Sequence, residues 1–259
     1  MFIIKLGGSV ITDKRRINTF EKVRTQSLVS EIKDAGKRTI IVHGAGSFGH
    51  ILAKKYELHK GLKNSHQIKA LAEVQKDVKT LNLMVLSAFQ DQGFNAVSLA
   101  PSAFLLNENG AVKSMDSDLF KKYLDLGLTP ITFGDVVLDE ALKFSICSGD
   151  QLMFELARVF KPDKVIFVTD VDGIFSSDPK SNKNAELLPI MDEKTFSQIR
   201  KSKSSVDDVT GSIYGKLEIM FKIASLGVET LIINGTVESR LRDALLSKDV
   251  ICSRIVSKP

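Results

Sequence analysis

His43-Gly44-Ala45-Gly46-Ser47-Phe48-Gly49-His50 stands between an apolar run, residues 39–42, and the segment 51–55. This order predicts a buried strand, then a glycine-rich turn, then a helix. Glycine lets the backbone take positive φ angles and approach a ligand closely. The first N–H groups of a helix have no partner inside it, so they offer a site for an anion. His50 adds a side chain that can donate a hydrogen bond at the same place.

Two nucleotide-binding motifs can be tested against this stretch. Gly44, Gly46 and Gly49 match the spacing of the dinucleotide-binding fingerprint, which also needs a strand ending in an acidic residue about 20 positions later. The corresponding region, residues 57–65, is polar and has no strand pattern. A P-loop is excluded because no Lys-Ser or Lys-Thr follows the glycines. A site for a phosphate-sized anion remains, with a tight turn that binds nothing as the simpler alternative.

The composition limits the classes of protein to consider. The chain has 259 residues, 43% of them hydrophobic, so it can bury a large core as one domain or two lobes. Its formal charge of +5 comes from 36 basic and 31 acidic residues scattered along the chain. With three tyrosines and no tryptophan, nucleic-acid binding has little support. A small anionic substrate accounts for a few well-placed lysines equally well.

Two further features concern the cellular compartment. Cys147 and Cys252 are the only cysteines in the sequence, which excludes a disulfide framework, and their spacing suits no metal site. We therefore expect a protein of the reducing cytoplasm. No apolar run approaches the ~18 residues of a membrane-spanning helix, so no membrane partner is expected.

Strand and helix patterns alternate along the whole chain. Strands are expected at residues 2–6, 39–42, 95–99, 129–133, 164–168 and 229–233. Helices are expected at about 19–35, 67–91, 117–126, 148–160 and 192–201 and after 211, with hairpins near 107–110 and over 136–146. This alternation predicts a mostly parallel, doubly wound sheet. No linker or repeat interrupts it, so both lobes are expected to share one sheet.

The segments that follow these strands carry most of the chemistry. They share glycines, lysines or aspartates at the edge where open α/β sheets bind ligands. The set comprises residues 5–9 with Lys14 nearby, 44–50, 148–150, 169–173, and 208–211 with Lys216. Taken singly, each has an ordinary structural explanation, such as an edge charge, a turn or the first turn of a helix. Their joint occurrence favours a site.

This set of loops resembles the amino acid kinase superfamily across nearly the whole chain. Lys-x-Gly-Gly-Ser at residues 5–9 and Thr-Asp-Val-Asp-Gly at 169–173 carry the likeness to the superfamily. Gly-Ser-Phe-Gly-His at 46–50 with Ser-Gly-Asp at 148–150 is similar to one branch, the isopentenyl phosphate kinases. One departure is Ser212, which follows Thr210-Gly211 where the family loop usually reads Thr-Gly-Gly.

The resemblance implies a three-layer αβα sandwich with a mostly parallel central sheet. It implies ATP-dependent phosphorylation of isopentenyl phosphate to isopentenyl diphosphate in the alternative mevalonate pathway, with Mg²⁺, and a homodimer. An N-terminal lobe, 1–155, would hold the acceptor phosphate, and a C-terminal lobe, 156–259, the nucleotide, within one continuous domain. No residue is assigned as a direct metal ligand.

The resemblance also implies roles for individual residues. Phosphate transfer would depend on Lys5, Lys14, His50, Asp150 and Lys216, with Asp150 orienting the lysines. The nucleotide would be bound by Lys5, Gly7, Gly8, Ser9, Gly46, Asp170, Asp172, Gly173, Gly211, Gly215 and Lys216. The acceptor would be bound by Gly44, Ala45, Gly46, Gly49, His50, Ser148 and Gly149, with Val74 and Val78 beside its tail.

Val74 and Val78 belong to an apolar stripe whose ordinary meaning is core packing. The stripe Leu71, Val74, Val78, Leu81, Val85 advances by three and four residues, so it forms one face of a helix. Because that helix follows the His50 loop, its first turns could instead wall an apolar pocket beside the anion site. Both interpretations stay open at the level of sequence.

The chemistry of a phosphate acceptor agrees with this assignment. A phosphomonoester has its second pKa near ~6, so it is already a dianionic nucleophile at neutral pH and needs no general base. Bringing two phosphate-bearing anions together is the difficulty, and lysines, backbone N–H groups and Mg²⁺ would offset their repulsion. His50 would then position the acceptor by a hydrogen bond. The alternatives are a same-fold kinase of a phosphonate or carboxylate and a non-catalytic nucleotide-binding module.

Overall fold

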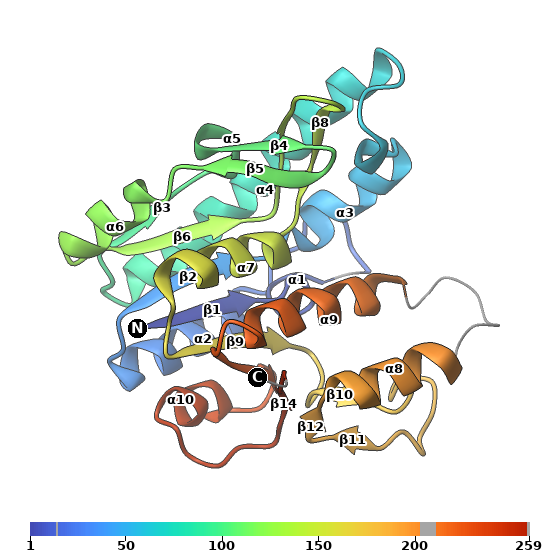
Figure 1. The fold of residues 1–259 in the computed structure, drawn as a ribbon. Helices are drawn as coiled ribbons and strands as arrows, with labels where there is room; N and C mark the ends of the chain where they lie inside the picture. Colours follow the sequence, from blue (N-terminus) through green and yellow to red (C-terminus); the bar gives the residue numbers. More distant parts are fainter. Residues whose placement is uncertain (14, 203–210, 258–259) are drawn as a thin grey trace.

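The computed structural model describes the backbone of residues 1–13, 15–202 and 211–257, and their side chains except those of 199–202 and 211–214. An eight-stranded sheet runs through the molecule (Figure 1). Neighbouring strands are parallel except for the pair at β13 and β14. In spatial order they are β12 (Ile190–Met191), β14 (Cys252–Ile255), β13 (Glu229–Asn234), β9 (Lys164–Thr169), β1 (Phe2–Leu6), β2 (Thr39–His43), β6 (Thr129–Phe133) and β3 (Ala96–Ser98).

Helices cover both faces of this sheet, because alternate strand residues point to opposite sides. Ile3, Ile40 and Val42 pack with one set of helices, and Ile4, Leu6 and Ile41 with the other. The first set is α6 (Asp118–Asp125), α7 (Gly149–Phe160) and α9 (Gly211–Ala224). The second is α1 (Gly8–Ile11), α2 (Lys22–Ala35), α4 (His66–Asp91) and α10 (Arg240–Leu245). The expected three-layer αβα sandwich is confirmed.

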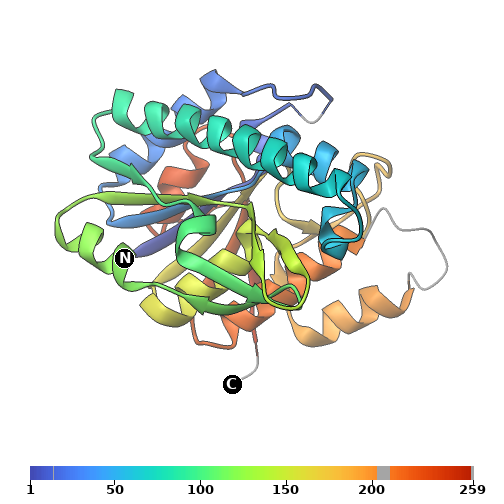
Figure 2. The same ribbon diagram turned by 90° about the horizontal axis from the view of Figure 1, so that it is seen from above.

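A second, smaller β-sheet is formed by residues between 105 and 147. It is a four-stranded sheet of β5 (Ala111–Met115), β4 (Leu105–Glu108), β7 (Asp135–Asp139) and β8 (Lys143–Cys147). A third apolar cluster fills the space between this sheet and the helices α3 (Gly46–Lys55) and α4. Figure 2 shows α4, in blue-green, running along this side of the molecule. The remaining elements are η1 (Leu58–Lys60), α5 (Pro101–Phe104), β10 (Ile174–Phe175), β11 (Leu187–Leu188) and α8 (Glu193–Ser202).

Most predicted elements lie within a few residues of their expected bounds. Helix α2 ends at Gly36, which takes a φ of 61°, as expected of a glycine stop. Its start is later than expected, at Lys22 instead of about Thr19, because Thr12 and Phe20 form a β-bridge before it. Helix α7 begins with a capping box in which Ser148 Oγ accepts from Gln151 N.

The two halves of the chain meet at β1. This strand pairs with β2 on one side and with β9 on the other, so one sheet crosses the expected boundary at residue 155. The division into an acceptor lobe and a nucleotide lobe remains a prediction. Among the helices of the described residues, none has the length and apolarity needed to cross a membrane.

Candidate active site

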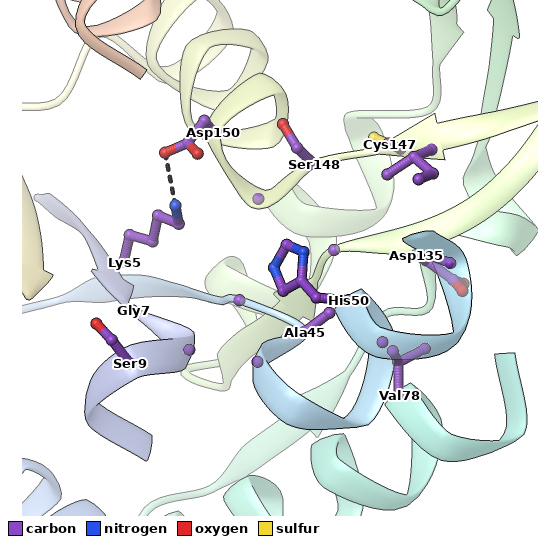
Figure 3. Close-up of a pocket in the computed structure, with 18 of the residues that line it drawn as sticks. Lys5, Gly7, Ser9, Ala45, His50, Val78, Asp135, Cys147, Ser148 and Asp150 are labelled. Carbon is purple, nitrogen blue, oxygen red and sulfur yellow. Dashed lines mark hydrogen bonds and ion pairs between the residues drawn. The ribbon is translucent and has the colours of Figure 1, made fainter. Parts of the chain in front are cut away.

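A pocket of about 450 Å³ opens where β1, β2 and β9 end. The first turns of α1, α3 and α7 border it, together with the turn between β6 and β7 (Figure 3). Fifteen of the residues that the sequence singled out line it: Lys5, Gly7, Gly8, Ser9, Gly44, Ala45, Gly46, Gly49, His50, Val74, Val78, Ser148, Gly149, Asp150 and Lys216. Loops that are distant in sequence therefore converge on one cavity.

A buried ion pair forms one wall of the pocket. Lys5 Nζ, at the end of β1, lies 2.5 Å from Asp150 Oδ1 in the first turn of α7 (Figure 3). The two residues keep only 9% and 7% of their accessible surface, and Lys5 Nζ also lies 5.8 Å from the ring centroid of Phe167. Burying both charges costs desolvation energy, which the close contact offsets. The pair holds a cation at a fixed position beside the glycine loops.

The two glycine loops touch each other through their backbones. A Cβ atom on Gly8 would lie 2.6 Å from the N and Cα atoms of Gly46, closer than two such atoms can approach. Gly46 itself has a φ of +50°, and a Cβ there would overlap the side chain of Thr12. The Thr12 hydroxyl donates to Gly8 O at 2.6 Å and accepts from Ser47 N at 3.1 Å. Thr12 thereby connects the two loops, a role that the sequence analysis missed.

Backbone N–H groups of these loops remain available to a ligand. Among the described residues, the N–H groups of Gly8, Ala45 and Gly46 have no hydrogen-bond acceptor. Gly8 and Gly46 are also the first residues of α1 and α3, where helix N–H groups have no intrahelical partner. With Lys5 alongside, this arrangement suits an anion with several oxygens, such as a phosphate.

His50 lies on the second turn of α3, and Figure 3 shows its ring projecting between Ala45 and Ser148. The Ser148 hydroxyl already accepts a hydrogen bond from Gln151 N at the start of α7. Lys216, on α9, is an exposed side chain at the pocket lining. Lys14 lies outside the described residues, and Gly211 is described only as the first residue of α9.

Some of the predicted nucleotide-binding residues, among them Asp170 and Asp172, lie outside the pocket lining of the described chain, although Thr169 at the end of β9 belongs to it. Asp170 forms an ion pair with Lys180. Asp172 pairs with Arg240 and also accepts from Asn234 Nδ2 at 3.2 Å. The remaining members of this group outside the lining are Gly173 and Gly215. Their role toward a nucleotide therefore remains a prediction.

The other end of the pocket is apolar. Val74 and Val78 of α4 line this end and also belong to the third apolar cluster. The apolar stripe of α4 therefore both packs in the core and lines the pocket. Val136 and Ile146 of the smaller sheet line it as well, and the sequence analysis did not single them out. The available signal in the sequence was Gly134-Asp135, which ends the predicted strand at 129–133. The turns that follow parallel strands lie at the edge of the sheet that binds ligands.

Asp135 is a buried carboxyl at the lining of this apolar end. Its Oδ1 accepts from Val136 N at 2.8 Å, and only 3% of the residue is exposed. Burial raises the pKa of the Asp135 carboxyl, although hydrogen bonds from Val136 and Ser102 act in the opposite direction. Protonation of Asp135 is therefore easier than protonation of an exposed aspartate.

The carboxylates near the pocket bear on how Mg²⁺ could bind. Within the described residues, no group of three or more His, Cys, Asp or Glu side chains could hold a metal ion. Mg²⁺ often keeps several waters and binds through substrate phosphates with one or two carboxylates. The donor set fits a magnesium ion that arrives on a nucleotide, with Asp135 and Asp150 as the acidic side chains of the described pocket lining.

The fold and the loops at the sheet edge define a class of protein. The model of the amino acid kinase family matches residues 1–234. Since this match spans most of the chain, the protein belongs to the amino acid kinase family.

Within that family, the chain is similar to isopentenyl phosphate kinases of several organisms. The enzyme of Methanothermobacter thermautotrophicus is 38% identical over the full length of both chains. That of Thermoplasma acidophilum is 37% identical over 94% of this chain and 95% of its own. A solved structure of isopentenyl phosphate kinase superposes with a TM-score of 0.85 at 36% identity, covering 99% of this chain and all of the other.

Proposed function

We propose that this protein transfers the terminal phosphate of ATP to isopentenyl phosphate, giving isopentenyl diphosphate and ADP. The observation that carries the proposal is the two-ended pocket. Lys5 and the N–H groups of two glycine loops occupy one end, and Val74, Val78 and neighbouring apolar residues the other. A small phosphate ester with a branched hydrocarbon tail has this same polarity. The relatives named above support the choice.

Transfer requires the protein to hold two anions close together, with the attacking and leaving oxygens in line at the γ-phosphorus. An oxygen of the acceptor phosphate forms a bond to the γ-phosphorus, the bond from that phosphorus to the β–γ bridging oxygen breaks, and ADP leaves with the electron pair. Because the acceptor is already dianionic near neutral pH, no side chain has to remove a proton. Mg²⁺ bound to ATP would neutralise part of the phosphate charge.

This chain's residues then serve as fixed donors. Lys5, held by Asp150, stabilises charge on the transferred phosphate, and Lys216 supplies a second cation from α9. Lys14 is proposed as a third cation on sequence grounds. The N–H groups of Ala45 and Gly46, with His50, hold the acceptor phosphate. Asp170, Asp172 and Gly173 are proposed to lie at the nucleoside end, in a C-terminal lobe that serves the nucleotide.

The biological setting follows from the same proposal. The reaction would belong to an alternative mevalonate route to isoprenoids, in the cytoplasm, where the free thiols of Cys147 and Cys252 would stay reduced. We also propose a homodimer. Exposed apolar side chains on α4, Ile68 and Leu83, are 59% and 60% accessible and offer surface for a second copy. Sedimentation velocity would contradict this by showing a monomer at micromolar concentration.

The direct test is a substrate screen with purified protein and Mg-ATP. Isopentenyl phosphate, a set of small carboxylates and a small phosphonate are offered at equal concentration, and ADP release is measured. We expect isopentenyl phosphate to have the highest kcat/KM. A higher value for a carboxylate or the phosphonate would identify a different kinase, and no turnover with any acceptor would favour a nucleotide-binding module.

His50→Ala is expected to lower turnover of isopentenyl phosphate by about 100-fold, the usual cost of losing one positioned donor. Binding of Mg-ATP, measured by calorimetry, should change little because His50 lies on the acceptor side. His59→Ala is the matched control, since His59 is exposed in η1 and does not belong to the described pocket lining. Near wild-type turnover of the His50 variant would remove His50 from the acceptor site.

Val74→Phe is expected to shift selectivity toward short acceptors. The larger ring would fill the apolar end, so kcat/KM for longer prenyl phosphates should fall relative to isopentenyl phosphate by about tenfold. Leu126→Phe, at the exposed end of α6 and outside the pocket lining, should leave this ratio unchanged. Thermal melts of both variants control for overpacking. An unchanged ratio in a folded Val74→Phe protein would assign Val74 to the core alone.

A further inference from the structure

A second histidine lies beneath the acceptor loop and has no part in the mechanism above. His43 is the last residue of β2 and directly precedes Gly44. It is completely buried, and its ring stacks on that of Phe133 with centroids 5.3 Å apart and planes 17° apart. A buried polar ring at this position needs hydrogen-bond partners, because leaving its nitrogens unpaired would cost stability.

Both ring nitrogens of His43 have a partner. Nδ1 lies 3.1 Å from Gly44 O, and Nε2 lies 3.2 Å from Oδ1 of Asn82 on α4. Asn82 Nδ2 lies 2.5 Å from Oγ of Ser98, the last residue of β3, which pairs with Ile131 of β6. A chain of hydrogen bonds thus runs from Ser98 through Asn82 and His43 to the backbone of the glycine loop.

The protonation state of this chain can be assigned from its chemistry. Burial lowers the pKa of His43 to about 4, with hydrogen bonds to Gly44 and Asn82 acting in the opposite direction, so the ring is neutral and carries one N–H. A carbonyl oxygen can only accept, so Nδ1 donates to Gly44 O. Nε2 must then accept, which requires the Asn82 carboxamide to be turned over from the orientation given above, so that its NH₂ group faces Nε2 and its oxygen faces the Ser98 hydroxyl. Every group in the chain is then satisfied.

The bond to Gly44 O fixes the peptide between Gly44 and Ala45. In a planar trans peptide, the carbonyl oxygen and the following N–H point in opposite directions. Holding Gly44 O against His43 therefore directs the Ala45 N–H away from His43. The Ala45 nitrogen would lie 3.8 Å from a Cβ atom added to Gly134, and Ala45 and Gly134 both line the pocket. Gly134 N in turn donates to His43 O at 3.0 Å, which holds this wall in place.

We propose that His43 is a positioning residue: its Nδ1–H holds the Gly44 carbonyl out of the pocket, so that the Ala45 N–H faces the acceptor phosphate. If the peptide turned over, a carbonyl oxygen would face that dianion in place of a donor. The inference deepens the proposed function and rests on it for the identity of the anion. His43 itself touches neither substrate nor nucleotide.

Two substitutions separate this hydrogen bond from simple packing. His43→Asn keeps an N–H donor near the position of Nδ1 but loses much of the ring, whereas His43→Leu keeps apolar bulk and has no donor. We expect His43→Leu to lower kcat/KM for isopentenyl phosphate by about tenfold or more. His43→Asn should restore most of the loss, and the Kd for Mg-ATP should stay within about threefold of wild type in both. Equal loss in the two variants, or better activity with leucine, would overturn the proposal.

A spectroscopic measurement needs neither variant nor substrate. Nitrogen-15 shifts of the histidine ring in the wild-type protein distinguish a protonated nitrogen from a bare one, and His43 is expected to be protonated at Nδ1 and bare at Nε2. The opposite tautomer would overturn the inference even if the variants fail to fold. Absence of turnover with isopentenyl phosphate by the wild type would instead overturn the proposed function, and the tautomer would still decide the hydrogen bond to Gly44.

Discussion

Lys5→Met is expected to lower kcat/KM for isopentenyl phosphate by about 100- to 1000-fold, measured by ADP release under saturating Mg-ATP. Methionine has a similar length and no charge, so the cationic wall of the pocket is lost. The change also leaves Asp150 as a buried carboxylate without its partner, beside the place where the phosphates bind. Its repulsion adds to the loss of attraction, which is why the effect should exceed that of removing a neutral donor.

The chain provides a matched control for this substitution. Lys164 is also buried, with 4% exposure, and pairs with Glu229 at 3.4 Å. It stands opposite Phe2 at the beginning of β9, so it lies at the other edge of the sheet from Lys5. Lys164→Met should therefore reduce thermal stability while the folded fraction keeps its turnover. Equal loss of turnover in both folded variants would show that Lys5 acts through the fold and not through the phosphates.

Gly8→Ala should be nearly as damaging, with a loss of turnover of about 100-fold or more. The added methyl carbon would meet backbone atoms of Gly46 at 2.6 Å, and backbone cannot rotate aside as a side chain can. The two glycine loops would have to separate, which would move the N–H donors of both and strain the hydrogen bonds of Thr12. Turnover and Mg-ATP binding should fall together, because the Gly8 loop is expected to face the nucleotide.

Gly127→Ala is the corresponding control. Gly127 follows α6 outside the pocket lining, and a Cβ there would have no atom of the described residues within 4 Å. Its φ of +77° disfavours alanine, so this variant should melt at a lower temperature while its folded fraction keeps its turnover. Full activity of a well-folded Gly8→Ala protein would mean that close contact between the loops is not required for transfer.

The sequence predicted those parts of the molecule that depend on local pattern. The period of the stripe from Leu71 to Val85 predicted α4, and Ser148-Gly149-Asp150 marked the start of α7, because helix periodicity and helix starts depend on neighbours in the chain. The convergence of Lys5, the 44–50 loop and Asp150 was also predictable, since the carboxyl ends of parallel strands share one edge.

The rest depended on contacts between distant residues. Val136 and Ile146 line the pocket because β7 and β8 pair and then pack on α3 and α4, and no local pattern states which helix a hairpin will cover. His43 stood in the sequence as the first residue of the glycine-rich stretch, and its partner Asn82 lies 39 residues further on in a helix. Thr12 connects two loops through a hydroxyl that, in sequence, resembles any other loop threonine.

The central place of β1 has a consequence for how the molecule folds. Its partners are β2, which follows closely, and β9, whose first residue pairs with Phe2 from 162 positions away along the chain. A ribosome must therefore synthesise well over half of the polypeptide before the middle of the sheet can be completed. Contacts of such long range slow folding and expose unfinished strand edges to aggregation. The N-terminal half made alone would leave the β9-pairing edge of β1 exposed, so it is expected to need a chaperone. In the whole chain, β9 covers this edge.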